Sequence, residues 1–289
     1  MNILLKRLFF TCIAAGFFSA SSQAADIERD VRTGPGGVDY SDGGYFEFGV
    51  DLNFRFFRER AFAGPGVVLA GAYRYRGLFF EALSPSAELP AGPIGGVSLG
   101  YTLWRNDQWA VDFLGVNATS RMATGRDHDD IDNSPDPVRE KAILERRTFY
   151  NGAGVRLTGY FGNTIFQYRL VTDTHGGKGI TSSARLGYSR QLRNWNYHGV
   201  VSANYTSQET GQYWYGISEE ESSTRLEAYD VNASTMNYSA EIGATYPVRK
   251  NVVFRSTMRY NELDDAIVRS PIQDSDFIVR WSNSISYVF

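Results

Sequence analysis

Charged side chains occupy several of the alternate positions in apolar segments of this chain. If those segments are β-strands, side chains two residues apart share one face, so the charges would line a common interior. Paired with one another, they would hold neighbouring strands together. Left solvated, they would line a selective pore. The residues concerned are the arginines Arg156, Arg169, Arg185, Arg255 and Arg259 and the acids Asp51, Asp112 and Glu241.

His198 and Ser202 could supply a base and a nucleophile, because both fall on one face of a predicted strand. At 3.3 Å per residue, however, they would lie about 13 Å apart, well beyond hydrogen-bond reach. A partner such as Ser183 or Ser189 would have to come from a neighbouring strand. The chain has no Gly-x-Ser-x-Gly, P-loop or HExxH pattern. We therefore expect a structural histidine and no catalytic residue.

Two acidic runs could carry chemistry. Residues Asp127 to Asn133 read Asp-His-Asp-Asp-Ile-Asp-Asn, and carboxylate oxygens suit calcium. The run lacks the turn glycine and the closing glutamate of an EF-hand, which favours a solvated loop tip. Glu219, Glu220 and Glu221 lie in a second polar segment, where carboxylate pairs could do acid–base work if their environment separated their pKa values. Three adjacent glutamates in a polar loop are expected instead to be solvated. We expect neither a metal site nor a cofactor.

The N-terminus has the organisation of a secretory signal peptide. Lys6 and Arg7 precede an apolar run from Leu8 to Phe18, and Ser22-Gln23-Ala24 is a small-x-small cleavage site. We expect residues 1–24 to be removed, and with them the chain's one cysteine. Thiolate chemistry would then be unavailable to the mature chain. Residues 25–43 are polar and are predicted to form a flexible periplasmic lead-in.

Charge and hydropathy exclude two classes of protein. Loss of the two basic leader residues takes the formal net charge from −3 to −5, whereas a nucleic-acid partner requires a clustered basic surface. No segment after the leader approaches 18 uninterrupted apolar residues, so transmembrane helices are not expected. Aromatic residues make up 15% of the chain, which suits strands with aromatic belts at a membrane interface.

Strict alternation of apolar and polar residues predicts β-strands along most of the chain. From Phe46 to Phe54, apolar residues at every second position alternate with small or polar ones. A helix could not place these two sets on opposite faces, whereas a strand does. Segments of about ten residues have the length that a tilted strand needs to cross a bilayer. Twelve strands are predicted, at residues 46–54, 69–75, 78–83, 97–103, 109–113, 147–159, 164–172, 182–191, 196–206, 234–246, 251–260 and 277–289.

The last predicted strand is aromatic on one face. Phe277, Trp281, Tyr287 and the terminal Phe289 share that face, and serines occupy much of the other. Outer-membrane barrels of bacteria commonly end on such a strand. We expect it to be the segment that the barrel assembly machinery recognises, and its aromatic residues to contact outer-membrane lipid and lipopolysaccharide.

The connections between the strands alternate in length. Tight turns are predicted at 74–77, 105–108, 160–163, 192–195 and 247–251, and long links at 56–66, 84–93, 120–146, 173–181, 207–233 and 261–276. Outer-membrane barrels have short periplasmic turns and long outer loops. Residues 44–289 are therefore predicted to form a twelve-stranded antiparallel transmembrane β-barrel with both termini in the periplasm of a Gram-negative cell. Twelve strands with arginines inside favour a narrow or plugged lumen.

Short motifs in the C-terminal third resemble those of the MipA/OmpV family, named for an MltA-interacting protein. Tyr215-Gly216-Ile217-Ser218 is similar to the family's Tyr-Gly-Val-Ser element, and Ser270-Pro271-Ile272 to its Ser-Pro-Ile-Val element. The ending Tyr287-Val288-Phe289 matches its Tyr-x-Phe. The first hairpin differs, with Asp51 to Arg55 where the family commonly has Pro-Tyr-Glu-Gly-Ser.

The resemblance implies an outer-membrane protein that is not an enzyme. Some members of that family are scaffolds that join a murein transglycosylase to a murein synthase, and others are surface adhesins or antigens. The resemblance implies one of these roles. The leading hypothesis is a scaffold whose periplasmic turns, with Arg105, Arg193, Arg249 and Lys250, bind such a partner. The alternatives are a narrow channel for small solutes, a surface adhesin or antigen and, third, a barrel hydrolase.

Overall fold

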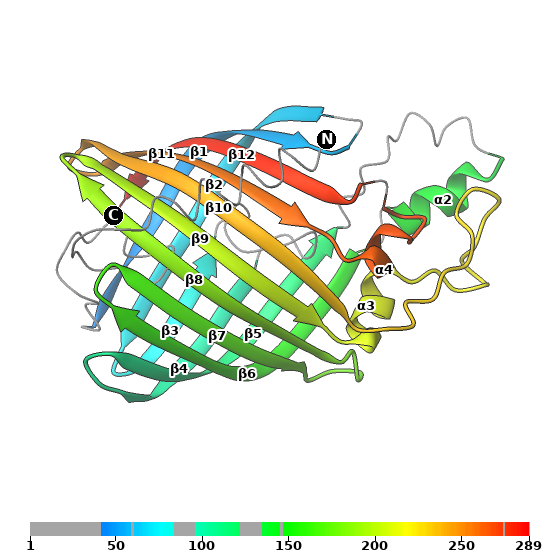
Figure 1. Cartoon of the computed structure of the whole chain (residues 1–289), viewed down its shortest axis with the longest axis horizontal. Coiled ribbons are helices and arrows are strands. Elements are labelled where there is room, and N and C mark those ends of the chain that lie inside the picture. The colour runs from blue at the N-terminus through cyan, green and yellow to red at the C-terminus, as the bar shows by residue number, and fades with distance from the viewer. Residues whose placement is uncertain are drawn as a thin grey trace.

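The computed structural model describes residues 42–58, 61–83, 96–121, 135–144, 147–273 and 275–288. In these ranges, twelve strands form one closed barrel (Figure 1). Each strand pairs with its sequence neighbours, β1 pairs with β12, and every pairing is antiparallel. The predicted fold, an all-β barrel of twelve strands, is confirmed.

Most strands are long enough to cross a bilayer at a tilt. Their bounds are β1 Gly43–Phe56, β2 Ala61–Tyr75, β3 Leu78–Leu83, β4 Gly96–Arg105, β5 Trp109–Arg121, β6 Arg147–Phe161, β7 Thr164–Asp173, β8 Ile180–Leu192, β9 Trp195–Thr206, β10 Thr235–Arg249, β11 Val252–Glu262 and β12 Phe277–Val288. Within the described ranges, three helices lie between strands: α2 Pro137–Leu144, α3 Gln208–Tyr215 and α4 Asp265–Val268.

The barrel closes between its first and last strands. The pairing runs from Glu47 opposite Val288 to Phe56 opposite Val279. Among the described residues, this closure leaves neither the first nor the last strand as a free sheet edge, which suits a strand in hydrocarbon because backbone polar groups there must be paired. The terminal Phe289 lies outside the described residues.

The two faces of each strand differ as the alternation predicts. On β1, Phe46, Phe48 and Val50 are exposed on the outer surface, whereas Glu47 and Asp51 at the alternate positions are buried in the interior. The same arrangement recurs around the barrel: apolar side chains lie outside and polar side chains lie inside, the reverse of a water-soluble protein. A lipid environment explains this arrangement, since the outer face would contact hydrocarbon and the inner face would not.

Tight turns join the strands at the end of the barrel where β1 begins and β12 ends. Between β2 and β3, Arg76 has φ 49° and Gly77 has φ 85°. Two consecutive positive φ values are typical of a type I′ turn, which matches the twist of the flanking strands. Arg193, in the turn between β8 and β9, also has a positive φ, at 55°.

The predicted long link at 56–66 is wrong. Strand β2 begins at Ala61, and Gly64, Pro65 and Gly66 pair with β1 instead of forming a loop. Glycine at position 66 leaves room for the Asp51 carboxylate, because a Cβ there would lie 2.2 Å from its Oδ1. Glycine and proline here therefore serve a close approach within the sheet and not a loop. Long and short connections consequently do not alternate strictly.

The other end of the barrel carries α2, α3 and α4, which lie close together in Figure 1. Among the described residues, no helix has the length and apolar character needed to cross a bilayer. The predicted signal peptide (1–24), all but the last two residues of the lead-in (25–43) and the acidic run 127–133 lie outside the described residues.

Candidate functional site

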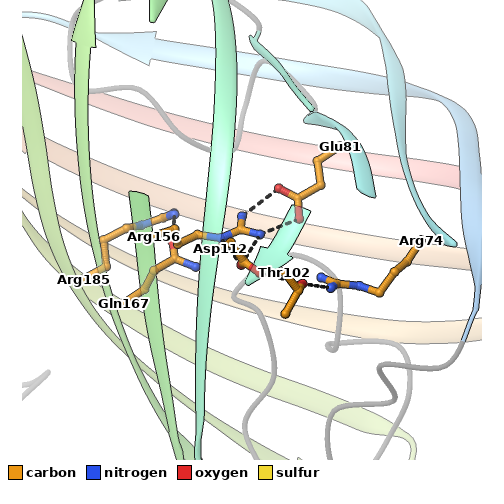
Figure 2. A network of polar contacts seen from close by, with 7 residues as sticks. All are labelled: Arg74, Glu81, Thr102, Asp112, Arg156, Gln167 and Arg185. Carbon is orange, nitrogen blue, oxygen red and sulfur yellow. Dashed lines mark hydrogen bonds and ion pairs between the residues drawn. The ribbon is translucent and has the colours of Figure 1, made fainter. Parts of the chain in front are cut away.

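Arg156 is the centre of a buried ion-pair network inside the barrel (Figure 2). From β6 its guanidinium donates to both carboxylate oxygens of Glu81 on β3, at 2.7 and 3.0 Å, and its Nε donates to Asp112 on β5 at 3.0 Å. All three residues are less than 10% exposed. The bidentate contact with Glu81 passes over two intervening strands, β4 and β5, and so ties β6 to β3 through the interior.

The network continues toward β2 through a hydroxyl. Thr102 on β4 donates to Asp112 at 2.7 Å and accepts a hydrogen bond from Arg74 on β2 (Figure 2). The guanidiniums of Arg74 and Arg156 lie 5.1 and 4.9 Å from the ring centre of Phe79, within cation–π range. Phe79 lies over Gly100, where an added Cβ would meet its ring at 2.2 Å.

The remaining predicted arginines of this wall lie on β7 and β8. Arg185 donates to Gln167 at 3.2 Å, and Figure 2 shows this pair beside Arg156. Arg169 is half-buried and stands opposite Arg156 and Ser183 in the register. Polar side chains therefore line the inner wall from β2 to β8.

A second ion-pair cluster lies on β9 to β11. Glu241 on β10 accepts from Arg259 Nε at 2.7 Å and contacts Nε2 of His198 at 3.1 Å. The His198 ring lies against Gly243, where a Cβ would be 2.3 Å from its Cε1. Arg255 lies 3.4 Å from Glu47 on β1. The histidine thus has a carboxylate partner inside the barrel.

The predicted inward charges are brought together in part. Arg156 pairs with Asp112 and Arg259 with Glu241, whereas Arg255 pairs with Glu47. Asp51 instead accepts hydrogen bonds from the side chains of Asn53 and Ser282. Sequence reasoning missed several partners, although all of them lie at alternating positions in strands: Glu47, Arg74, Glu81 and Thr102.

The serines near His198 do not form a catalytic pair with it. Ser202 shares a hydrogen bond with Ser239, and Nδ1 of His198 is buried without a hydrogen-bond partner. Ser189 stands opposite His198 in the register, and Ser183 has a buried hydroxyl without a hydrogen bond. Within the described ranges, no group of three or more His, Cys, Asp or Glu side chains could hold a metal ion.

The helical end of the barrel is a packed structure, which we call the cap. It comprises α2, α3, α4 and the described parts of two links, 216–234, 269–273 and 275–276. Its apolar core includes Phe57, Ile143, Tyr215, Ile217, Leu226, Val231, Leu263, Ile267, Ile272 and Ile278. Burial raises the pKa of the Tyr215 phenol above its ordinary value. These loops therefore have a core of their own.

The two predicted motifs meet inside the cap. The Ser270 hydroxyl donates to the backbone carbonyl of Tyr215 at 2.7 Å, and both residues are buried. Ile272 is fully buried in the cap core, as is Ile217, whose backbone pairs with that of Tyr229. The motif residues therefore serve cap folding.

The other motif residues are also accounted for. Gly216 ends α3 where an added Cβ would lie 2.4 Å from the Gln212 side chain, and Pro271 is half-buried beside Ser270. Ser218 donates to the carboxylate of Glu221 at 3.1 Å. Glu219 and Glu220 are exposed, as expected for a solvated run.

Helix α3 joins the cap to the barrel wall. The ring of Trp214 lies 5.9 Å from that of Tyr150 on β6, and Trp214 packs against both the cap core and a second cluster of buried side chains. That second cluster, Phe79, Leu114, Tyr150 and Val171, comes from β3, β5, β6 and β7. At the other side of α3, Lys178 lies 4.4 Å from the ring centre of Tyr213. Trp214 thus connects the cap with the barrel interior.

A closed antiparallel barrel with an apolar outer face and buried ion pairs inside defines the class of bacterial outer-membrane β-barrels. The family model of the MltA-interacting protein MipA matches residues 58–289. The chain therefore belongs to the MipA family.

Curated relatives and solved structures are similar to this chain over different lengths. The MltA-interacting proteins of Escherichia coli K12 and Shigella flexneri are each 30% identical over 90 residues, covering 31% of this chain and 36% of theirs. The match thus spans about a third of those relatives.

Two solved structures are similar to this chain in fold. The match to the NanC porin has a TM-score of 0.45 and 9% sequence identity, and it covers 83% of this chain and 98% of the porin chain. The match to OmpT, an outer membrane protein of Vibrio cholerae, has a TM-score of 0.37 and 7% sequence identity, and it covers 86% of this chain and 98% of the OmpT chain.

Proposed function

We propose that this chain is a non-enzymatic outer-membrane interaction protein that works through its two ends and not through its lumen. The observation that carries the proposal is the bidentate Arg156–Glu81 contact, which runs along the inner wall from β6 to β3 and occupies part of the interior. A buried ion pair held by further hydrogen bonds is costly to break, so these side chains stay in place on the inner wall. We infer that they narrow the lumen. Trp214 of the cap adds bulk at the adjoining mouth.

The end of the barrel that carries the tight turns, which we call the turn end, is the surface that we propose binds a partner in the periplasm. Its exposed charged side chains are mostly basic. They are Arg76, Arg105, Arg193, Arg249 and Lys250, with Asp42 and Asp107 as exposed acids. A basic surface steers and orients an acidic partner surface. The relatives' name, MltA-interacting protein, supports a murein transglycosylase as that partner, with a murein synthase as the second member of a scaffolded pair.

The proposed orientation follows from export and assembly. A cleaved signal peptide delivers the chain to the periplasm, and the aromatic C-terminal strand is recognised by the barrel assembly machinery. The turn end, which carries β1's start and β12's end, then faces the periplasm. The cap faces outward among lipopolysaccharide, where an adhesin or antigen role would also place it.

Co-purification tests the proposal. The barrel with Arg105, Arg193, Arg249 and Lys250 each changed to Gln should lose a murein transglycosylase that the unaltered barrel retains. The matched control changes Arg225 and Arg269, exposed in the cap, to Gln and should retain it. Migration of unheated samples in detergent gels verifies folding of each variant. Equal recovery with the turn variant would refute the proposed surface.

A narrow channel is the second candidate function. It is favoured by one observation: Arg55 and Arg280, which point inward on β1 and β12, are only half-buried. Solvent therefore reaches part of the interior. Conductance measurements separate this candidate from the first.

A further inference from the structure

Two neighbouring hairpins at the turn end carry exposed basic side chains and no carboxylate of their own. They are the β8–β9 and β10–β11 hairpins, which lie side by side because β9 pairs with β10 (Figure 1). Residues 186–199 and 244–257 include no Asp or Glu. The exposed basic residues of these two segments, which we call the basic cluster, are Arg190, Arg193, Arg249 and Lys250.

The other turns at this end have a different charge pattern. In the β4–β5 turn, Arg105 is accompanied by exposed Asp107. In the β2–β3 turn, the backbone N–H of Arg76 donates to the carboxylate of Asp42. The β6–β7 turn, residues 161–164, has no charged residue. The surplus of positive charge is therefore local to the two hairpins of β8 to β11.

Four aromatic rings lie together beside the basic cluster. The ring centre of Trp195 is 4.8 Å from that of Tyr246, 6.1 Å from that of Tyr197 and 6.4 Å from that of Phe254. These residues come from β9, β10 and β11, at the end of each strand next to the turns. Aromatic girdles of outer-membrane barrels lie at the boundary between hydrocarbon and headgroups. The four rings therefore mark that boundary on this wall.

Arg190 faces the membrane side of the wall and not the lumen. It stands opposite Tyr197 in the register, and directly opposed residues share one face of a sheet. His198, the next residue along β9, contacts Glu241 in the interior, so Tyr197 and Arg190 point outward. The other members of the basic cluster lie at the hairpin ends, just beyond the rings. The basic cluster thus extends from the outer wall to the turns.

This combination suits the headgroup of an anionic phospholipid. Guanidinium forks donate paired hydrogen bonds to phosphate oxygens, and a lysine adds a compact positive charge. Long basic side chains can lay their stems along apolar surface while the charged ends reach the headgroups. Basic clusters next to a membrane boundary attract anionic lipids for these reasons. The rings beside them would pack against the glycerol and the first part of the acyl chains.

We propose that the basic cluster and the Trp195 rings form a binding site for the phosphodiester headgroup of an anionic phospholipid, such as phosphatidylglycerol, in the periplasmic leaflet. The site rests on the proposed orientation, in which the turn end faces the periplasm, and goes beyond the proposed partner surface. Arg193, Arg249 and Lys250 belong to both surfaces. Arg190 and the rings belong to the lipid site alone, so the two can be tested separately.

Short-chain phosphatidylglycerol is the probe, and phosphatidylcholine with the same acyl chains is the control lipid without net charge. The thermal midpoint of the refolded full barrel in a non-ionic detergent is measured over a titration with each lipid, with no murein enzyme present. A ligand that binds only the folded state raises the midpoint in a saturable manner. We expect this rise with phosphatidylglycerol and not with phosphatidylcholine.

Arg190→Gln combined with Lys250→Gln should lower the affinity for phosphatidylglycerol by about tenfold or more, since it removes two of the four cations. The charge-matched control, Arg225→Gln with Arg269→Gln, removes two exposed cations from the cap and should leave the response unchanged. If the hairpin variant does not fold, Arg190→Gln alone replaces it, with a loss in the same direction. Equal responses to the two lipids, or equal affinities in the hairpin and cap variants, would overturn the proposal.

The orientation on which the site rests has its own test. Arg193→Cys should resist a maleimide coupled to a large polyethylene glycol chain in intact cells, and should react once the outer membrane is permeabilised. Reaction in intact cells would place the turns outside and overturn the periplasmic site together with the orientation. Protection in intact cells without a phosphatidylglycerol response would overturn the lipid site alone and leave the proposed partner surface standing.

Discussion

Ser270 donates a hydrogen bond from its hydroxyl to the backbone carbonyl of Tyr215, at 2.7 Å and across 55 positions of sequence. This bond joins the link after α4 to the end of α3. It explains why two short motifs far apart in the chain belong to one structure. The cap is held by such contacts between loops, and not by the barrel alone.

Replacing Ser270 should loosen the cap. Ser270→Ala leaves a buried carbonyl without its donor, which costs about 1–3 kcal/mol. The expected result is faster proteolysis within residues 216–234 of an otherwise folded barrel. Ser222→Ala is the control, because Ser222 bonds the carbonyl of Glu219 at an exposed position. Equal proteolysis rates for the two variants would show that the Ser270 bond does not hold the cap.

Removing Arg156 should destabilise the whole barrel. Arg156→Met leaves Glu81 and Asp112 buried without their counter-charge, which costs about 3–5 kcal/mol. Urea unfolding of the refolded barrel measures the loss. Arg105→Met, at an exposed turn position, should change the free energy of unfolding by less than about 0.5 kcal/mol. Similar losses in both variants would contradict a special role for the network.

A methyl group at position 243 should displace His198. The added Cβ of Gly243→Ala would lie 2.3 Å from Cε1 and 2.7 Å from Nε2, so the ring must leave Glu241. The lost buried contact should cost about 1–3 kcal/mol and lower the thermal midpoint. Gly64→Ala is the matched control, because nothing lies within 4 Å of its added Cβ. An unchanged midpoint in Gly243→Ala would mean that His198 has another stable position.

Alkaline pH should weaken the cap through Tyr215. Burial raises the phenol's pKa in the folded cap, so the unfolded form loses its proton first. Cap stability should therefore stay constant up to about pH 10 and fall above it. Tyr215→Phe should reduce that fall, as measured by proteolysis of residues 216–234 between pH 9 and pH 11. The same decline in the variant would assign the effect to other tyrosines.

Strand positions could be predicted from the sequence because alternation is a local property. Phe46 to Phe54 and the ending Phe277 to Val288 show it without help from distant residues. The link at 56–66 was wrong because Gly64-Pro65-Gly66 has the composition of a loop, whereas its role depends on Asp51 of the neighbouring strand.

The interior contacts were harder to predict, since they depend on register and on strands that are not neighbours. Asp112 opposite Arg156 is a register pair that adjacent strands could suggest. Glu81 reaches Arg156 over two strands, which no periodicity indicates. The cap core was missed for the same reason: Tyr215 and Ser270 meet only when two long links fold against each other.

Conductance of the purified, refolded barrel in a planar lipid bilayer tests most directly the claim that the ends, and not the lumen, do the work. We expect no stable unitary steps from a barrel whose folding is verified independently. Stable steps whose ion selectivity changes when Arg255 or Arg259 is replaced by Gln would contradict it and establish a channel.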